Sequence, residues 1–166
     1  MRAVPTALEE RLRRVAGAIP DPELPVVTLG ELGVLRQVRV TGPDRVTVEL
    51  TPTYTGCPAV EVMAAEIREA LHRQGMAHVE VRTVLSPPWT TDAISEEGRR
   101  KLAEAGIAPP RPVAATGGPV PLTLGIRCPR CGATDTTLLS RFSSTACLSL
   151  RRCESCGEPF DHVKEV

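Results

Sequence analysis

Two Cys-x-x-Cys pairs stand in the C-terminal third of the chain, in "CPRCG" and "CESCG", with 21 residues between them. Their candidate metal ligands are Cys128, Cys131, Cys153 and Cys156. Four thiolates spaced in this way can hold one Zn²⁺ in a closed tetrahedral site, and the glycine after each pair tolerates the positive φ that such a bend needs. The same sulfur set also suits a single iron. We favour zinc, because closed four-cysteine sites so commonly hold it.

Disulfide bonds are the alternative for these cysteines. The sequence "MRAVPTALEERLRRVAGAIP" has no continuous apolar run of the signal-peptide kind, and no apolar run is long enough to span a membrane. We therefore expect a cytoplasmic protein with no membrane partner, in which thiols stay reduced and six cysteines favour metal binding or catalysis. Cys147 lies outside the pairs and is interpreted as a buried small apolar residue, with an exchangeable metal ligand as the alternative.

Cys57 belongs to a different stretch, "ELTPTYTGCPAVEVM", where a predicted strand runs into a predicted helix. We place Cys57 at the N-cap and Pro58 at the first helical position, where the missing N–H costs nothing. A thiol there faces the positive end of the helix, so its pKa should fall and its thiolate fraction should rise. The alternative is a structural cysteine at a tight turn formed by Gly56, and position alone does not separate the two.

Two carboxylates, Asp21 and Glu23, stand on the proline-stiffened segment "DPELP". One interpretation is that they terminate and cap the preceding helix. The other is that they lie beside Cys57 and form a mixed carboxylate–thiolate site suited to weak iron binding, because carboxylates are hard ligands that hold Fe²⁺ less selectively than thiolates. In that arrangement the carboxylates would oppose thiolate formation and raise the pKa of Cys57.

The hydrophobic periodicity predicts a small α+β domain in the first half of the chain. Helical spacing of apolar residues, bounded by Thr6 and Pro20, predicts the first helix, and turn residues in "TGPDR" predict a hairpin. The segment "DPELPVVTLGELG" is interpreted as an ordered loop. The expected elements are a helix over 6–19, strands over 34–40 and 46–50, a helix over 57–75 and a strand over 78–85.

Three parts are predicted along the chain: a domain over 1–108 with a C-terminal extension, a Pro/Gly-rich linker over 109–121, and a cysteine-containing ribbon over 122–166. The extension should include a short helix capped by Ser95, with Glu96–Arg100 and Glu97–Lys101 as ion pairs. The ribbon is too short for a core of its own, so metal binding should supply its folding energy.

The composition argues against a nucleic-acid-binding protein. Twenty basic and 20 acidic residues give zero formal net charge, whereas nucleic-acid binders usually carry a basic excess. Aromatic residues are only 2%, too few for a base-stacking platform. A zinc-ribbon adaptor for nucleic acid or protein nevertheless stays as the alternative function. A di-iron oxygenase component is disfavoured, because such sites take a Glu-x-x-His motif from each of two helices, and the chain has a single one, "EALH" over 69–72.

Two stretches resemble a known family. "DPELPVVTLGELGVLRQVRV" and "TPTYTGCPAVEVM" are similar to the MIP18 (DUF59) family, which is associated with iron–sulfur protein maturation and carries an Asp-Pro-Glu loop and a Thr-rich turn ending in Cys-Pro. "LSPPWTTDAISEEGRRKLAEAGIAPP" and the ribbon with "STAC" and "CGEPF" narrow the likeness. Nearly the whole chain resembles the PaaD (PaaJ) family of accessory subunits of the bacterial phenylacetyl-CoA 1,2-epoxidase.

The resemblance implies a non-catalytic accessory subunit in phenylacetate degradation, which helps to install iron or an iron–sulfur cluster in a partner. The expected partners are the oxygenase and [2Fe–2S] reductase subunits of the epoxidase system. Because a closed four-cysteine site has no open position, we expect the ribbon Zn²⁺ to be structural. We assign transfer of iron or a cluster to Cys57, with Asp21 and Glu23 as the accompanying carboxylates.

Overall fold

The computed structural model describes residues 6–111 and 125–165. The chain divides into two compact units, with the boundary between Trp89 and Thr90. None of the helices in the described ranges combines the length and apolar character needed to cross a membrane.

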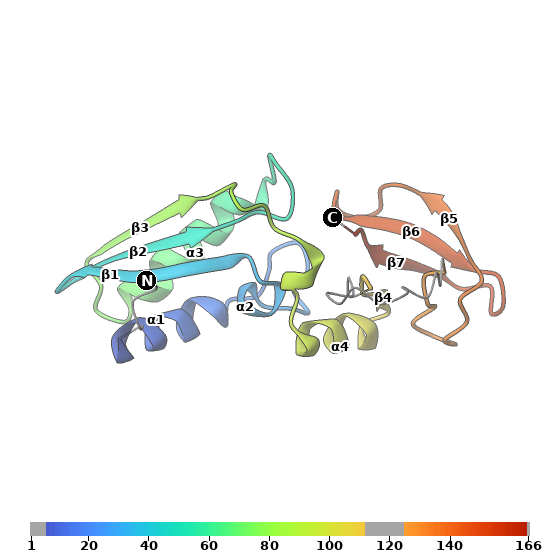
Figure 1. Ribbon diagram of the computed structural model, residues 1–166, viewed down its shortest axis with the longest axis horizontal. Helices are drawn as coiled ribbons and strands as arrows, with labels where there is room; N and C mark the ends of the chain where they lie inside the picture. The colour runs from blue at the N-terminus through green and yellow to red at the C-terminus, as the bar shows by residue number, and fades with distance from the viewer. Residues whose placement is uncertain (1–5, 112–124, 166) are drawn as a thin grey trace, which may run out of the picture. The chain divides into compact units, whose positions relative to one another are not determined.

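The first unit is the predicted α+β domain with one additional helix (Figure 1). The strands form one sheet in the order β1-β2-β3, in which β1 and β2 are antiparallel and β2 and β3 are parallel. Helix α3 is the crossover that a parallel pair requires. The elements are α1 (Ala7–Gly17), α2 (Leu29–Leu32), β1 (Leu35–Gly42), β2 (Arg45–Leu50), α3 (Ala59–His72) and β3 (His78–Thr83).

Helix α1 begins where the sequence predicts it. Thr6 is the N-cap, and its hydroxyl accepts a hydrogen bond from the Glu9 N–H at 3.2 Å while the Glu9 carboxylate accepts from the Thr6 N–H at 2.8 Å. This reciprocal capping box satisfies two of the N–H groups that have no partner at a helix start. The helix buries Leu12 and Ala16 completely, so its apolar side faces the sheet.

The additional helix, α2, lies in the segment that was expected to be a loop. Thr28 and Glu31 form a second capping box, and Gly33 ends the helix with φ 75°. A single turn has too few residues to show periodicity, so only the Thr-x-x-Glu spacing could have revealed it. An isolated bridge between Pro20 and Thr28 closes the loop that contains Asp21 and Glu23.

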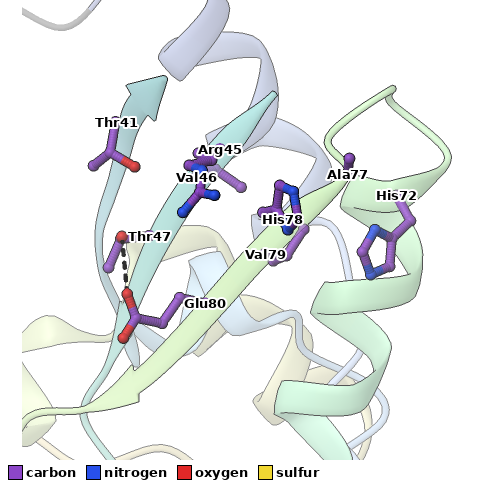
Figure 2. Close-up of a pocket in the computed structure, with 9 residues that line it drawn as sticks. All are labelled: Thr41, Arg45, Val46, Thr47, His72, Ala77, His78, Val79 and Glu80. Carbon is purple, nitrogen blue, oxygen red and sulfur yellow. Dashed lines mark hydrogen bonds between the residues drawn. The ribbon is translucent and has the colours of Figure 1, made fainter. Parts of the chain in front are cut away.

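The sheet has one buried face and one open face. Val46, Val48 and Leu50 of β2 are almost fully buried, and α3 contributes apolar residues such as Ile67 and Leu71 to the same core. The alternate residues of β2 lie on the open face. A pocket beside β2 and β3 has Arg45, Thr47 and Glu80 of this face in its lining, and the Thr47 hydroxyl donates to the Glu80 carboxylate at 3.4 Å (Figure 2). The open face is therefore polar.

The second unit contains a four-stranded sheet in the order β4-β7-β6-β5. Its elements are a 3₁₀ turn (Thr91–Ala93), α4 (Glu96–Glu104), β4 (Ile107–Ala108), β5 (Thr136–Ser140), β6 (Leu148–Cys153) and β7 (Pro159–Val163). Strand β4 pairs in parallel with β7. This long-range pairing explains why the extension from Thr90 groups with the C-terminal unit, whereas the sequence predicted a first domain ending at 108. The predicted linker over 109–121 falls outside the described residues from 112 onward.

Helix α4 is capped as predicted but paired differently. The Ser95 hydroxyl accepts from the Gly98 N–H at 3.0 Å. Arg100 binds Glu97 and Glu104 instead of the predicted Glu96. The Arg100 guanidinium thus forms two ion pairs, one with a carboxylate three residues before it and one with a carboxylate four residues after it. Both pairs are exposed, so together they contribute little to stability.

His162 of β7 gives the second unit a dependence on pH. It is buried, and burial, aided by Arg151 and Arg111 and opposed by Glu165, lowers its pKa to about 4. In the unfolded chain the pKa of histidine is about 6.5. Between these values the unfolded chain binds the proton and the folded chain does not, so stability is lost as the pH falls from about 6.5 to about 4. We expect a loss of roughly 3 kcal/mol from this residue.

The measurement is the denaturant midpoint of the C-terminal unit at pH 7, 5.5 and 4.5, in wild type and in His162→Gln. Acid also releases zinc by protonating thiolates, so zinc content is followed in both proteins. The difference between the two proteins isolates His162. Parallel pH profiles for wild type and variant would contradict the assignment.

Candidate metal centres

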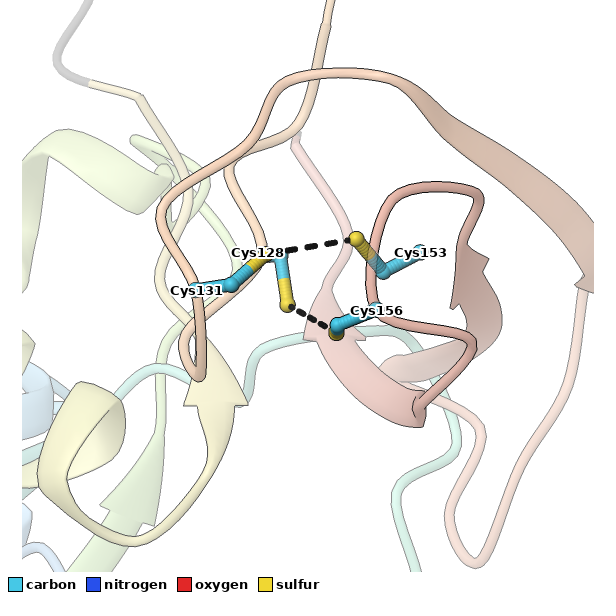
Figure 3. Close-up of side chains that lie close together, drawn as sticks. All are labelled: Cys128, Cys131, Cys153 and Cys156. Carbon is cyan, nitrogen blue, oxygen red and sulfur yellow. Dashed lines mark hydrogen bonds between the residues drawn. The ribbon is translucent and has the colours of Figure 1, made fainter.

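The four paired cysteines come together at two matching turns in the second unit (Figure 3). In the first turn the Gly132 N–H donates to the Cys128 carbonyl at 2.9 Å, and in the second the Gly157 N–H donates to the Cys153 carbonyl at 2.9 Å. Both glycines have positive φ, 77° and 78°. Because a Cβ disfavours this conformation, glycine after each pair is what lets both sulfurs turn toward one point.

The sulfur positions fit one tetrahedral ion. All four Sγ atoms lie within 4.8 Å of one another, with Cys128–Cys156 at 3.9 Å and Cys131–Cys153 at 3.5 Å. A zinc–sulfur bond of about 2.3 Å places tetrahedral sulfurs roughly 3.8 Å apart. Cys128 and Cys153 are buried, in a small cluster with Ala108, Ile126 and Phe160. The donor set is all sulfur and leaves no open position, as in structural zinc sites.

The closeness of the four sulfurs separates the pKa values of the thiols. A backbone N–H of Cys156 lowers the pKa of Cys153 to about 7. A hydrogen bond from the Glu158 backbone N–H lowers the pKa of Cys156, but burial and the neighbouring thiols outweigh it and raise this pKa to about 12. Sulfurs this close do not all ionise without a positive charge between them.

The second candidate centre is built around the loop that follows α1. Asp21 is 3% exposed, and its Oδ1 accepts hydrogen bonds from the Glu23 N–H at 2.9 Å and the Leu24 N–H at 2.7 Å. Asp21 therefore caps the turn that follows it, and not the preceding helix, which ends at Gly17. Burial raises its pKa, and the two N–H groups oppose that change.

Glu23 does not point away to solvent; it lies beside Cys57. The Cys57 Sγ and Glu23 Oε2 atoms are 3.9 Å apart, although the residues are 34 positions apart in the chain. Burial, followed by repulsion from Asp21, raises the pKa of Glu23. The structure thus brings two of the three predicted site side chains into contact, and the third sets the turn and adds its charge.

Cys57 differs from its predicted state in three ways. Helix α3 has Pro58 as its N-cap, so Cys57 precedes the cap. Its side chain is buried, with 8% of the residue exposed. Burial raises its pKa, and the Glu23 and Asp21 carboxylates raise it further, while hydrogen bonds from the Ala59 N–H and the Tyr54 side chain oppose the change. The expected fall in pKa is therefore wrong, because burial and two negative charges outweigh the helix end.

Tyr54 is the residue of this site that was not predicted from the sequence. It lies three positions before Cys57 in "TPTYTGCP", and its side chain is hydrogen-bonded to the Cys57 thiol. The threonines of this segment have a different task. The Thr51 hydroxyl accepts from Arg36 Nε at 2.9 Å, and the same guanidinium donates to the carbonyls of Pro87 and Pro88. Thr51 thus anchors the segment.

Cys147 lies outside the four-cysteine cluster. It is half-buried, and its sulfur lies 3.0 Å from the Thr145 hydroxyl. The cysteine cluster found in the described residues consists of the four paired cysteines alone.

Two family models match the chain. "Iron-sulfur cluster assembly protein" matches residues 6–85 and "PaaD zinc beta ribbon domain" matches residues 115–164. The first contains Asp21, Glu23 and Cys57, and the second contains the four paired cysteines. The ribbon match and the sulfur geometry together support a structural Zn²⁺, as predicted.

Curated proteins and a solved structure agree with this division. An Escherichia coli (strain K12) protein named as one of the subunits of 1,2-phenylacetyl-CoA epoxidase is 47% identical over 88% of this chain and 86% of its own. An iron–sulfur protein maturation auxiliary factor of Porphyromonas gingivalis is 32% identical over 57% of this chain and 90% of its own. A DUF59 domain from Bacillus anthracis superposes with a TM-score of 0.54 at 26% identity, covering 58% of this chain and 92% of its own.

Proposed function

Since the chain belongs to the PaaD family of 1,2-phenylacetyl-CoA epoxidase subunits, we propose that it is a non-catalytic accessory component of such a system in phenylacetate degradation. Its role is to help install iron or an iron–sulfur cluster in a partner, and the partners are the oxygenase and the [2Fe–2S] reductase. The relatives of the N-terminal unit support this role, because they are named as iron–sulfur protein maturation auxiliary factors.

The observation that carries the proposal is the 3.9 Å contact between Cys57 Sγ and Glu23 Oε2. It places one soft and one hard ligand atom side by side. Thiolates select iron and clusters, whereas carboxylates bind Fe²⁺ with less selectivity. A site with one of each binds iron through few strong bonds and can release it.

Protonation of the ligand groups is coupled to metal binding at this site. The pKa values of Asp21, Glu23 and Cys57 are all raised, chiefly by burial. An incoming cation favours the ionised ligands, so binding releases the thiol proton of Cys57 to solvent. Iron affinity should therefore increase with pH, because fewer protons compete for the ligands as the pH rises. Departure of the metal to a partner lets the thiol take up a proton again.

The zinc unit has a different task in this proposal. A closed four-cysteine site cannot pass its metal on easily, because it has no open coordination position. Near it, strand β5 and the turn after it expose three large apolar side chains: Leu138 (45%), Leu139 (49%) and Phe142 (64%). Exposed apolar residues along an edge strand are typical of protein-binding surfaces. This favours docking of a partner protein over binding of nucleic acid.

Replacing Glu23 with glutamine tests the site. The variant keeps the side-chain size but replaces the charged carboxylate, a metal ligand, with a neutral amide. Maturation of the partner should therefore be impaired, while the melting temperature should be unchanged. Removing the charge should also lower the pKa of Cys57, so alkylation of Cys57 by iodoacetamide at fixed pH should become faster.

The control is Glu66→Gln, which removes a charge from the exposed side of α3. It should change neither maturation nor Cys57 alkylation. A loss of stability in Glu23→Gln with normal maturation would make this loop structural only.

A further inference from the structure

The two edge strands of the sheet in the first unit differ in how their outward backbone groups are covered. At the β1 edge, Glu9 and Arg13 of α1 bind three of the backbone groups. The Val40 N–H donates to Glu9 Oε1 at 2.8 Å, and the guanidinium of Arg13 donates to the carbonyls of Leu35 and Arg36 at 3.3 and 3.1 Å. Such coverage stops another strand from pairing with that edge.

The β3 edge has no such coverage within residues 6–89, where β3 is the last strand of the sheet (Figure 1). The His78 N–H donates to the Asp44 carbonyl, and the Val84 N–H donates to the Leu50 carbonyl. Even-numbered residues of β3 therefore face β2. The backbone groups of Val79, Val81 and Thr83 point the other way, because alternate residues of a strand bond to opposite sides.

We propose that this edge is a self-association surface, on which β3 pairs antiparallel with β3 of a second copy to join two sheets into one. A two-fold axis passes through Val81, so the same residues serve both copies. Val81 pairs with Val81 of the second copy, and Val79 pairs with Thr83 of the second copy. All are residues with outward backbone groups, as hydrogen-bonded pairs in an antiparallel ladder require.

The charges on the open face select this register. Glu80 and Arg82 lie between the hydrogen-bonded positions, and within one copy their side chains form an exposed ion pair at 2.8 Å. With the axis at Val81, Glu80 of each copy lies opposite Arg82 of the other. These are non-hydrogen-bonded pairs, in which side chains come closest and opposite charges stabilise the pairing.

Neighbouring registers are disfavoured by the same two charges. The outward groups can pair again only after one strand slides by two residues along the other, and this moves the two-fold axis by one residue, to position 80 or 82. With the axis at 80, Glu80 of one copy lies opposite Glu80 of the other. With the axis at 82, Arg82 lies opposite Arg82. Like charges directly opposite each other destabilise a ladder.

The helix-side face of β3 also fits a second copy. Val79 and Val81 share a face with the buried residues Val46 and Val48, yet each stays half-exposed. Leu85, just beyond the strand, is 56% exposed. Pairing along β3 would remove apolar surface of the two valines from water, which favours association.

Sedimentation equilibrium of the full zinc-loaded chain tests the proposal. Wild type should form a reversible dimer that weakens as salt rises, because exposed charges are screened. Val81→Pro should be monomeric with its secondary structure and zinc content kept, since proline removes an outward N–H and leaves the bonds to β2 in place. Val81→Thr, which keeps the N–H and the branched side chain, should remain dimeric.

Charge reversals test the register. Glu80→Arg and Arg82→Glu should each raise the dimer dissociation constant about tenfold, and the double reversal should restore it. Three results would each overturn the proposal: a wild type that is monomeric at every concentration, a dimer that survives Val81→Pro, or a double reversal no better than the single ones. A dimer lost in Leu139→Asp but kept in Val81→Pro would assign association to β5 instead.

Discussion

Replacing Cys128 with serine is expected to release the zinc and unfold the C-terminal unit, while the N-terminal unit stays folded. Structural zinc contributes about 10–16 kcal/mol in small zinc domains, which matches or exceeds the whole stability of a typical domain. The apolar cluster at this site is small, and two of its buried members, Cys128 and Cys153, are themselves ligands. The remaining contacts do not replace the lost metal bonds.

The measurement is zinc content together with limited proteolysis followed by mass spectrometry. Wild type should hold about one zinc per chain, as one four-cysteine site requires. Cys147→Ser is the matched control, because Cys147 lies outside the cluster; it should keep both the zinc and the protease resistance. Full secondary structure after exhaustive chelation of wild type would refute a folding role for zinc.

The second large effect is expected from Cys57→Ala. The reductase that we propose as a partner, purified from cells that carry this variant, should lack its [2Fe–2S] cluster, because the only soft ligand of the proposed transfer site is gone. Folding and zinc content should be kept, since removing one buried sulfur leaves a small cavity that costs about 1 kcal/mol.

Visible absorption, iron and acid-labile sulfide of the reductase give the readout, and the melting temperature of the variant gives the check on folding. Cys57→Ser adds a variant of nearly the same volume that also lacks the soft ligand. Cys147→Ala controls for the loss of any thiol. If Cys57→Ala complements a deletion strain fully, Cys57 is a structural residue.

Local signals in the sequence were sufficient for the main elements. The capping residue Thr6, the stop at Pro20 and the apolar spacing around Ile67 depend on near neighbours only, and the helices lie where these signals place them. The same applies to the metal ligands, because a Cys-x-x-Cys-Gly turn is a local structure. Helix α2 carried a local signal too, the pair Thr28 and Glu31, but one turn is too short for periodicity.

Long-range contacts account for what the sequence did not predict. The pairing of Ala108 with His162 joins residues 54 positions apart and moves the boundary between the units. The thiol of Cys57 meets a carboxylate from another loop, as one of the two interpretations of that loop had it, and burial with this contact raises its pKa. Spacing in the sequence does not decide whether such distant residues meet. The sequence nonetheless identified both partners of the contact, because each stood out as a reactive residue beside a proline.

Transfer of ⁵⁷Fe from the purified protein to the metal-free reductase tests the central claim most directly. The full zinc-loaded chain is charged with ⁵⁷Fe³⁺ and sulfide without oxygen, because two Fe³⁺ and two S²⁻ give the oxidised cluster with no further oxidant. It is then mixed with the reductase, and the reductase is re-isolated for Mössbauer spectroscopy. Wild type should deliver a [2Fe–2S] signal faster than the same iron and sulfide added alone, and Cys57→Ala should fall to the rate of that blank. Equal delivery by wild type and Cys57→Ala would contradict the account.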